Sequence, residues 1–211
     1  MKILFKSNLA LCLTLFSFLF INAQQKRNME NTALLIIDVQ NDYFPGGKME
    51  LTGAESAANN AKKILEYFRE NNLPIIHIKH IAMNEGAEFF LPDTSGAEIH
   101  SSVAPKNGEK IIIKNFPNSF RETDLLRYLH KSGIKNLVIT GMMTDVCVDS
   151  TVRAAFDLGF KNTVIGNATA TRDRALNGQV IKAAEVQRSF LAGMSALGNL
   201  YAEIVSDIGS F

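Results

Sequence analysis

The sequence lacks the patterns that mark nucleic-acid-binding and dinucleotide-binding proteins. Its 211 residues carry a formal net charge of +1 and no dense cluster of lysines and arginines, so there is no electrostatic footprint for nucleic acid. No Gly-x-Gly-x-x-Gly follows the first predicted strand, which disfavours a Rossmann dinucleotide enzyme. These absences favour small-molecule chemistry and predict that nucleic acid is not a partner.

Cysteine is also scarce, since only Cys12 and Cys147 occur. Cys12 lies in an N-terminal segment that we expect to be removed. Cys147 would then be the sole cysteine, which excludes an internal disulfide even in an oxidising compartment. With 46% hydrophobic and 20% charged residues, the chain can bury one well-filled core, and we expect a single domain.

The first 23 residues have the pattern of a secretory signal peptide. Lys2 and Lys6 precede an apolar run over residues 9–21, and Ala23 offers a small residue at a cleavage site. The apolar run is shorter than the roughly 20 residues that cross a bilayer, so we expect no stable membrane anchor. The pattern predicts an exported protein, periplasmic or secreted.

Residues 24–30 are polar and are interpreted as a linker to a domain over residues 31–211. Met29 lies immediately before that domain. Translation from Met29 would make the protein cytoplasmic, and this alternative stays open beside export.

Apolar runs and helical periodicity alternate along the domain. Alternating strands and helices predict an α/β fold with right-handed crossovers: a Rossmann-like, six-stranded parallel sheet between two helical layers, in a three-layer αβα arrangement. A long loop over residues 82–105 interrupts the alternation. The predicted strands are 33–37, 75–78, 110–114, 137–140, 163–165 and 202–205, and the predicted helices are 54–71, 119–132, 146–158 and 179–197.

Local capping patterns predict where two of these helices begin. Ser119 and Glu122 form a capping box, and Gly133 follows the end of the same helix. Thr144 is interpreted as the N-cap of the next helix, which would place Cys147 near its third position. Unpaired backbone N–H groups and the helix dipole would stabilise a thiolate there.

Three chemically active residues fall at the carboxyl ends of predicted strands, where ligands bind in open parallel sheets. They are Asp38 after the first strand, Lys114 at the end of the third and Cys147 just beyond the fourth. A carboxylate can accept the thiol proton, and a cation can stabilise the thiolate. Each residue also has a structural explanation, as a turn cap, a solvated lysine or a packing cysteine, but their convergence predicts a nucleophilic site.

Three segments resemble the isochorismatase-like cysteine hydrolases, a superfamily that includes nicotinamidases, N-carbamoyl amide hydrolases and streptothricin-type hydrolases. The resemblance covers residues 31–206. The segments that carry it are Leu35-Ile36-Ile37-Asp38-Val39-Gln40-Asn41-Asp42-Tyr43-Phe44, Lys114-Asn115-Phe116-Pro117-Asn118-Ser119-Phe120 and Gly141-Met142-Met143-Thr144-Asp145-Val146-Cys147-Val148.

The resemblance implies a role for each matching residue. Asp38 would be the general base, Lys114 its electrostatic partner and Cys147 the nucleophile. It also implies a cis peptide between Met142 and Met143, which would aim the N–H groups of Met143 and Cys147 into an oxyanion hole. Assembly into a homo-oligomer is a further expectation.

Cys147 narrows the reaction that the resemblance implies. Isochorismatases proper cleave a vinyl ether and usually lack the nucleophilic cysteine, so its presence favours a small amide, ureido or carbamoyl substrate cleaved through a thioester. A vinyl ether hydrolase and a catalytically silent binding protein on the same fold stay as alternatives.

We expect neither a metal nor another cofactor. The metal-binding nicotinamidases resemble one another in an Asp-x-His motif, and the neighbourhood of residues 46–49 has no histidine. His77 and His80 are three apart on a strand and would face opposite sides, which makes them a poor ligand pair.

Several other residues are candidates for the substrate pocket or its rim. Arg172, Asp173 and Arg174 follow the fifth predicted strand and either bind an anionic substrate or form a solvated or intersubunit charge cluster. The pocket candidates are Gln40, Phe44 and Phe120, with Phe89 and Phe90 in the long loop.

Overall fold

The computed structural model describes residues 29–206. The expected signal peptide and nearly all of the expected linker lie outside the described residues. Within the described part of the chain, no helix is both long and apolar enough to cross a bilayer.

A six-stranded parallel sheet forms the centre of the molecule, in the order β3-β2-β1-β4-β5-β8, and confirms the predicted α/β fold. β1 lies inside the sheet and all six of its residues are buried, as its unbroken apolar run predicts. The strands are β1 (Thr32–Ile37), β2 (Ile75–His80), β3 (Lys110–Lys114), β4 (Asn136–Met142), β5 (Lys161–Ala170) and β8 (Glu203–Val205).

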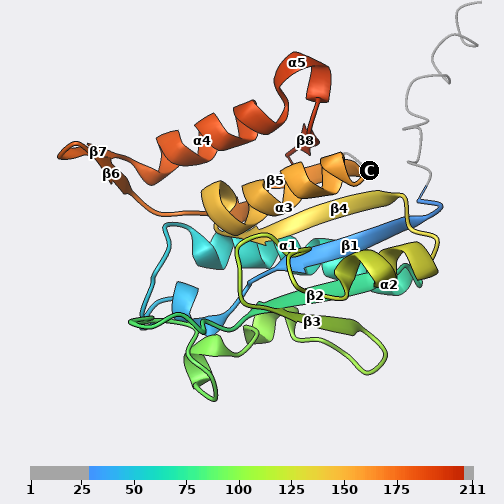
Figure 1. Ribbon diagram of the computed structural model, residues 1–211, viewed down its shortest axis with the longest axis horizontal. Coiled ribbons are helices and arrows are strands. Elements are labelled where there is room, and N and C mark those ends of the chain that lie inside the picture. The colour runs from blue at the N-terminus through green and yellow to red at the C-terminus, as the bar shows by residue number, and fades with distance from the viewer. Residues whose placement is uncertain (1–28, 207–211) are drawn as a thin grey trace, which may run out of the picture.

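Helices cover both faces of the sheet and complete the three layers (Figure 1). Helix α1 (Ala54–Glu70) packs on one face, because residues such as Ala61, Leu65 and Phe68 recur every three or four positions and are buried together. The opposite face is covered by α2 (Leu125–Lys131), α3 (Asp149–Asp157) and α4 (Ala183–Met194), and α4 is followed by the short α5 (Ala196–Asn199).

The long loop after β2 carries two 3₁₀ turns, η2 (Ser95–Ala97) and η3 (Ser101–Val103), and packs against a third, η1 (Asn41–Tyr43), that follows β1. Phe90 of this loop is buried against Tyr43, with ring centroids 4.6 Å apart. The loop is therefore part of the core at the carboxyl end of the sheet.

The prediction of one helix over residues 179–197 is wrong at its start. β6 (Arg174–Leu176) and β7 (Gln179–Ile181) form an antiparallel hairpin that projects beyond α4 (Figure 1). Asn177 and Gly178 connect its strands with φ of 51° and 78°, the left-handed pair that a tight hairpin turn requires. The Asn-Gly turn outweighs helical periodicity here, and α4 begins only at Ala183.

The capping box predicted at Ser119 and Glu122 is also wrong. The Ser119 hydroxyl lies 2.9 Å from Thr151 Oγ1 on α3, and Glu122 is exposed with a left-handed φ of 55°. The helix therefore begins at Leu125. Its end agrees with the prediction, because Gly133 has a φ of 67° just past the last turn.

Candidate active site

The sheet order brings together three strand ends that are far apart in sequence. β1 has β2 on one side and β4 on the other, and β3 lies beyond β2. Asp38 follows β1, with a left-handed φ of 50°. Lys114 ends the edge strand β3, and its long side chain crosses the end of β2 to reach Asp38.

The carboxyl end of β4 approaches β1 closely. Gly141 pairs with Ile37 in the register of β1 and β4. Its φ is 129°, and a Cβ atom there would collide with the Ile37 carbonyl oxygen, so only glycine fits. The next peptide bond, between Met142 and Met143, is cis. Cys147 follows in the short π-helix η4 (Thr144–Val148), which leads into α3.

The interpretation of Thr144 as an N-cap is therefore wrong. Its hydroxyl donates to Gln187 Oε1 of α4 at 2.5 Å, and no side chain caps η4. Cys147 lies inside a π turn, not in the first turn of an α-helix. Because η4 leads directly into α3, Cys147 still lies near the N-terminal end of a continuous helical segment.

The Lys114 ammonium lies at the centre of the site and is fully buried. Its Nζ lies 2.7 Å from Asp38 Oδ2 and 3.4 Å from Cys147 Sγ. It also lies 2.9 Å from His80 Nδ1 and donates to the Phe116 carbonyl oxygen at 3.1 Å. The structure thus brings together all three residues that the strand ends predict, and adds His80.

Burial and neighbouring charges set the protonation states at the site. Burial alone would lower the pKa of Lys114, but Asp38 and Cys147 raise it above its ordinary value, so the amine is an ammonium. Burial raises the pKa of the Cys147 thiol, the Asp38 carboxylate raises it further, and Lys114 opposes both. The resting group is therefore a thiol, and a thiolate forms only if its proton is transferred.

Asp38 is positioned to receive that proton. Its carboxylate is fully buried, and apart from the ion pair with Lys114 its two oxygens have no hydrogen-bond partner among residues 29–206. Ligand-type atoms of Asp38, His80 and Cys147 lie within 4.8 Å of one another. A carboxylate with free acceptor capacity next to a thiol is the arrangement that general-base catalysis needs.

The same three residues are the only cluster of potential metal ligands found in the described part of the chain. Lys114 Nζ lies within 3.4 Å of each of them and supplies the positive charge at their centre. The cluster therefore does not fit a metal ion.

His80 is the site residue that sequence reasoning missed. Its signal was available, because it ends β2 at the same sheet edge and pairs with Lys114 in the register of β2 and β3. His77 does lie apart from it, as predicted, and contacts Glu109 at 2.9 Å.

The predicted pocket residues lie around the site at different depths. Gln40 is fully buried, and its amide bonds the backbone of His80 and the Ala97 carbonyl, so direct contact with a substrate is not part of this geometry. Phe44 stacks on His100 with centroids 3.6 Å apart. Phe120 stacks on Phe160 at 5.9 Å, on the side of α2 and α3.

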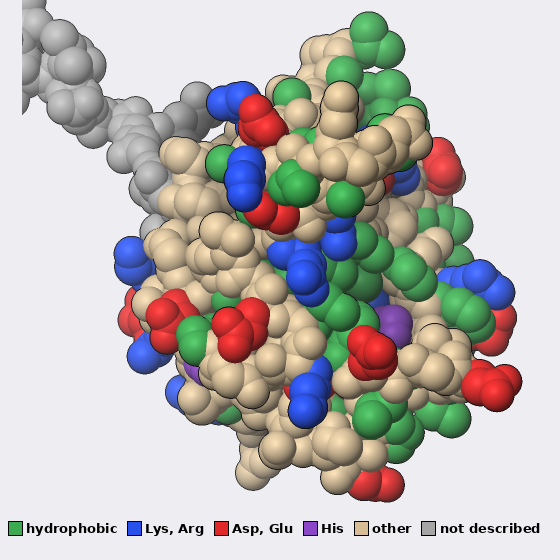
Figure 2. Space-filling view, turned by 90° about the vertical axis from the view of Figure 1, so that its left-hand side faces the viewer, with side chains coloured by type: hydrophobic (Ala, Val, Ile, Leu, Met, Phe, Trp, Pro, Cys, Tyr) green, Lys and Arg blue, Asp and Glu red, His purple; other side chains and the backbone are tan. Residues whose placement is uncertain are grey.

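Two of the charged residues after β5, Asp173 and Arg174, form ion pairs within the protein. Arg174 donates to Asp145 Oδ2 at 2.6 Å, and this pair connects the start of the hairpin to η4, the element that contains Cys147. Asp173 pairs with Lys182 at 2.8 Å. Seen from the side on which the hairpin projects, hydrophobic side chains collect in a hollow between charged groups (Figure 2).

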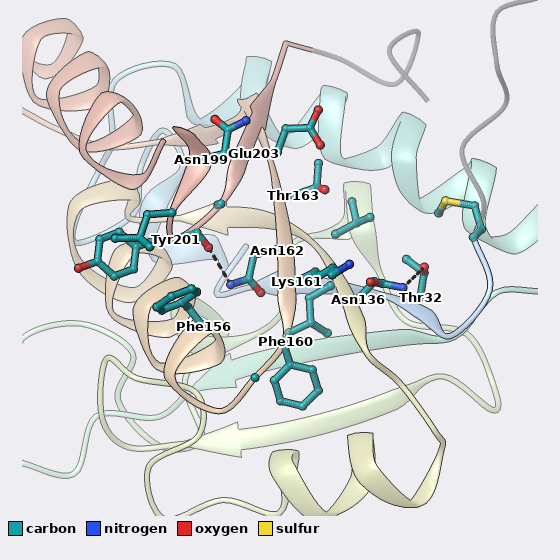
Figure 3. A pocket seen from close by; sticks show the side chains of 16 residues that line it. Thr32, Asn136, Phe156, Phe160, Lys161, Asn162, Thr163, Asn199, Tyr201 and Glu203 are labelled. Carbon is teal, nitrogen blue, oxygen red and sulfur yellow. Dashed lines mark hydrogen bonds between the residues drawn. The ribbon is translucent and has the colours of Figure 1, made fainter. Parts of the chain in front are cut away.

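A cavity of about 560 Å³ lies at the opposite end of the sheet (Figure 3). It opens between the amino ends of β4, β5 and β8, with Phe156, Phe160 and Tyr201 on one side. None of the residues that line it is a cysteine, histidine or aspartate. Reactive groups converge at the carboxyl end of the sheet instead.

Comparisons with known proteins agree with this architecture. Residues 32–194 match the family model of the isochorismatase domain. The isochorismatase-family protein YddQ of Bacillus subtilis is 46% identical over 173 residues, which cover 82% of this chain and 94% of YddQ. The crystal structure of an isochorismatase from Pseudomonas putida KT2440 superposes with a TM-score of 0.78 at 32% identity, covering 85% of this chain and 89% of that one.

Two more distant relatives have names that specify a substrate, and one of them is named an amidohydrolase. The ureidoacrylate amidohydrolase RutB of Caulobacter vibrioides is 28% identical, covering 66% of this chain and 77% of RutB. The streptothricin hydrolase of Streptomyces noursei is 29% identical, covering 67% of this chain and 50% of that enzyme.

Proposed function

Because the chain belongs to the isochorismatase family of hydrolases, we propose that it cleaves a small amide, ureido or carbamoyl C–N bond through a thioester on Cys147. One observation carries the proposal: a buried ammonium, Lys114, contacts both a carboxylate and a thiol, at 2.7 Å from Asp38 and 3.4 Å from Cys147. Hydrolysis of a vinyl ether forms no acyl intermediate and therefore does not require that thiol.

The first half-reaction forms the thioester. Asp38 accepts the Cys147 proton as Sγ attacks the carbonyl carbon, and the carbonyl oxygen becomes an oxyanion. The backbone N–H groups of Met143 and Cys147 are the proposed donors to it. The tetrahedral intermediate collapses, the C–N bond breaks, and Asp38 returns its proton to the leaving amine.

The second half-reaction hydrolyses the thioester. Asp38 takes a proton from a water molecule as the water oxygen attacks the acyl carbon, and the thiol is regenerated when that proton reaches the departing Sγ. Lys114 stays charged in both halves and stabilises the negative charge that appears on sulfur. This cycle needs no further cofactor.

A substrate screen with an inactive control tests the proposal. Purified protein comprising residues 24–211 is incubated with nicotinamide, ureido acids and small amides, and with isochorismate as the rival vinyl ether. We expect release of amine or ammonia from a C–N substrate and a covalent acyl adduct on Cys147, detected by mass spectrometry after acid quench. The Cys147→Ala variant should show neither.

Two outcomes would overturn the proposal. Full activity in Cys147→Ala would exclude a thioester mechanism. Turnover of isochorismate alone, without an adduct, would assign the protein to vinyl ether hydrolysis.

Export and assembly are separate proposals. The pattern of residues 1–23 supports a cleaved signal peptide, and N-terminal sequencing of the native protein should find Gln24 first. A protein that begins at Met29 would refute export. Self-association follows from the family resemblance alone and can be measured by sedimentation.

A further inference from the structure

His80 is held rigidly at the end of β2. Its backbone N–H donates to Gln40 Oε1 at 2.7 Å, and its carbonyl oxygen accepts from Gln40 Nε2 at 2.8 Å. Gln40 Nε2 also donates to the Ala97 carbonyl oxygen, which ties the long loop to the same point. Gln40 therefore fixes the backbone position from which the His80 ring extends towards the site.

The contact between His80 and Lys114 defines what the imidazole does. Nδ1 of His80 lies 2.9 Å from Nζ of Lys114. An ammonium can only donate, so Nδ1 must be an acceptor and the proton of the neutral ring lies on Nε2. Burial, and then the Lys114 charge, lower the pKa of His80 to about 4, while Asp38 opposes them only in part. The ring is therefore neutral at neutral pH.

The acceptors around Nζ show why this contact matters. An ammonium has three N–H groups, and four acceptors surround it: Asp38 Oδ2 at 2.7 Å, His80 Nδ1 at 2.9 Å, the Phe116 carbonyl oxygen at 3.1 Å and Cys147 Sγ at 3.4 Å. The sulfur contact is the longest of the four. Its geometry depends on acceptors that keep the ammonium from moving wholly onto Asp38.

We propose that His80 is a positioning residue, which accepts one Lys114 N–H through Nδ1 and thereby keeps the ammonium in contact with the Cys147 sulfur. Without this acceptor, a buried N–H loses its partner, and Nζ moves towards the remaining oxygens. The ammonium then stabilises the thiolate less. His80 itself takes no part in proton transfer to the substrate.

This inference deepens the proposed function, yet it can be tested without a substrate. The titratable groups that face Cys147 are Asp38 after β1, Lys114 of β3, His80 of β2 and Tyr43 of η1. Of these, only His80 is changed in the experiment. The rate of Cys147 alkylation by iodoacetamide as a function of pH reports directly on the thiol.

Two substitutions separate acceptor loss from loss of the ring. His80→Asn keeps an acceptor oxygen close to the position of Nδ1, and His80→Leu removes it. We expect His80→Leu to shift the alkylation midpoint to higher pH and to slow alkylation at neutral pH by about 10- to 100-fold. His80→Asn should stay within about 5-fold of the parent protein, which is less than the typical cost of losing one hydrogen bond to a charged group. On a substrate that the parent protein hydrolyses, kcat should follow the same order with little change in KM.

His130 is a matched control, because it is exposed on α2 and belongs to no part of the site. His130→Leu should alkylate like the parent protein. Equal alkylation profiles for His80→Leu and the parent would overturn the inference, and so would an equal loss in His80→Asn and His80→Leu at unchanged melting temperature. If no substrate is found but the alkylation order holds, the proposed function fails while the positioning role stands.

Discussion

Two clusters at opposite ends of the sheet, one partly buried and one fully buried, combine a carboxylate, a cation and a histidine but differ in function. Glu109, before β3, binds Arg69 Nε at 2.7 Å and Nη2 at 2.9 Å, accepts from the Lys106 backbone N–H at 2.8 Å and contacts His77 at 2.9 Å. Within the part of the chain that the structure describes, the Asp38 carboxylate has only its ion pair with Lys114, beside a thiol.

The comparison shows that unused acceptor capacity separates a reactive carboxylate from a structural one. Glu109 is fully satisfied: burial alone would raise its pKa, but Arg69, the Lys106 N–H and His77 lower it to about 2. This lowered pKa makes Glu109 a poor proton acceptor at neutral pH. Asp38 keeps acceptor capacity in a buried position, next to a group whose proton must leave.

Asp38→Asn should cause the largest loss of activity of any single substitution in the two clusters. An amide cannot accept the thiol proton, so we expect kcat to fall by at least about 1,000-fold, as for removal of other essential catalytic groups. The fold should persist, since asparagine is nearly isosteric, but the free energy of unfolding should fall because the buried Lys114 ammonium loses its carboxylate partner. Kinetics and circular dichroism on the same preparation measure both. Retained activity would show that Asp38 is as structural as Glu109.

Lys114→Met should affect both activity and stability. It leaves Asp38 as an unpaired buried charge, which typically costs about 3–5 kcal/mol of unfolding free energy. We expect kcat to fall by about 100-fold or more through lost stabilisation of charge on sulfur. The double variant Asp38→Asn with Lys114→Met should recover most of the stability in urea titrations but none of the activity. Failure to recover it would mean that the pair is not coupled as the 2.7 Å contact implies.

Glu109→Gln should have the smallest effect on activity and a moderate effect on stability. Losing charge-assisted bonds to Arg69 and His77 should cost about 1–3 kcal/mol at neutral pH, with kcat nearly unchanged.

The pH dependence of that cost has a fixed sign. Folding lowers the pKa of Glu109 from 4.5 to about 2, so its contribution is complete above about pH 5 and is lost as pH falls through that interval. Urea unfolding between pH 7 and pH 2 should show the parent and variant converging at the acid end. A constant difference across that range would contradict the assigned pairing.

Strand ends could be predicted from sequence because burial and topology determine them. Three predicted strands end at or shortly before Asp38, Lys114 and Cys147. The rule that parallel strands share a carboxyl edge is enough to predict that these residues lie together. The same rule places His80 at this edge, because His80 ends β2 and pairs with Lys114 in the register of β2 and β3. The spacing of His80 from His77 bears only on a metal site and carries no information about Lys114.

Hydroxyl and turn residues were harder to predict, because their partners are distant in sequence. Ser119 and Thr144 have ordinary capping sequences, but their hydroxyls bond Thr151 and Gln187 on other helices. No local pattern contains those partners. The hairpin around Asn177 could have been predicted locally, because the Asn-Gly turn signal lies within the segment itself. That signal outweighs the helical periodicity of the residues that follow it.

Lys114 belongs to β3, which is hydrogen-bonded to β2 alone and exposes Ile111 and Ile113. The outermost strand of a sheet is among the first parts to detach in local opening. A one-residue slip of β3 would turn the lysine to the opposite face. Hydrolysis in this protein would then cease well before global unfolding, which makes enzymatic turnover a sensitive probe of fraying at that border.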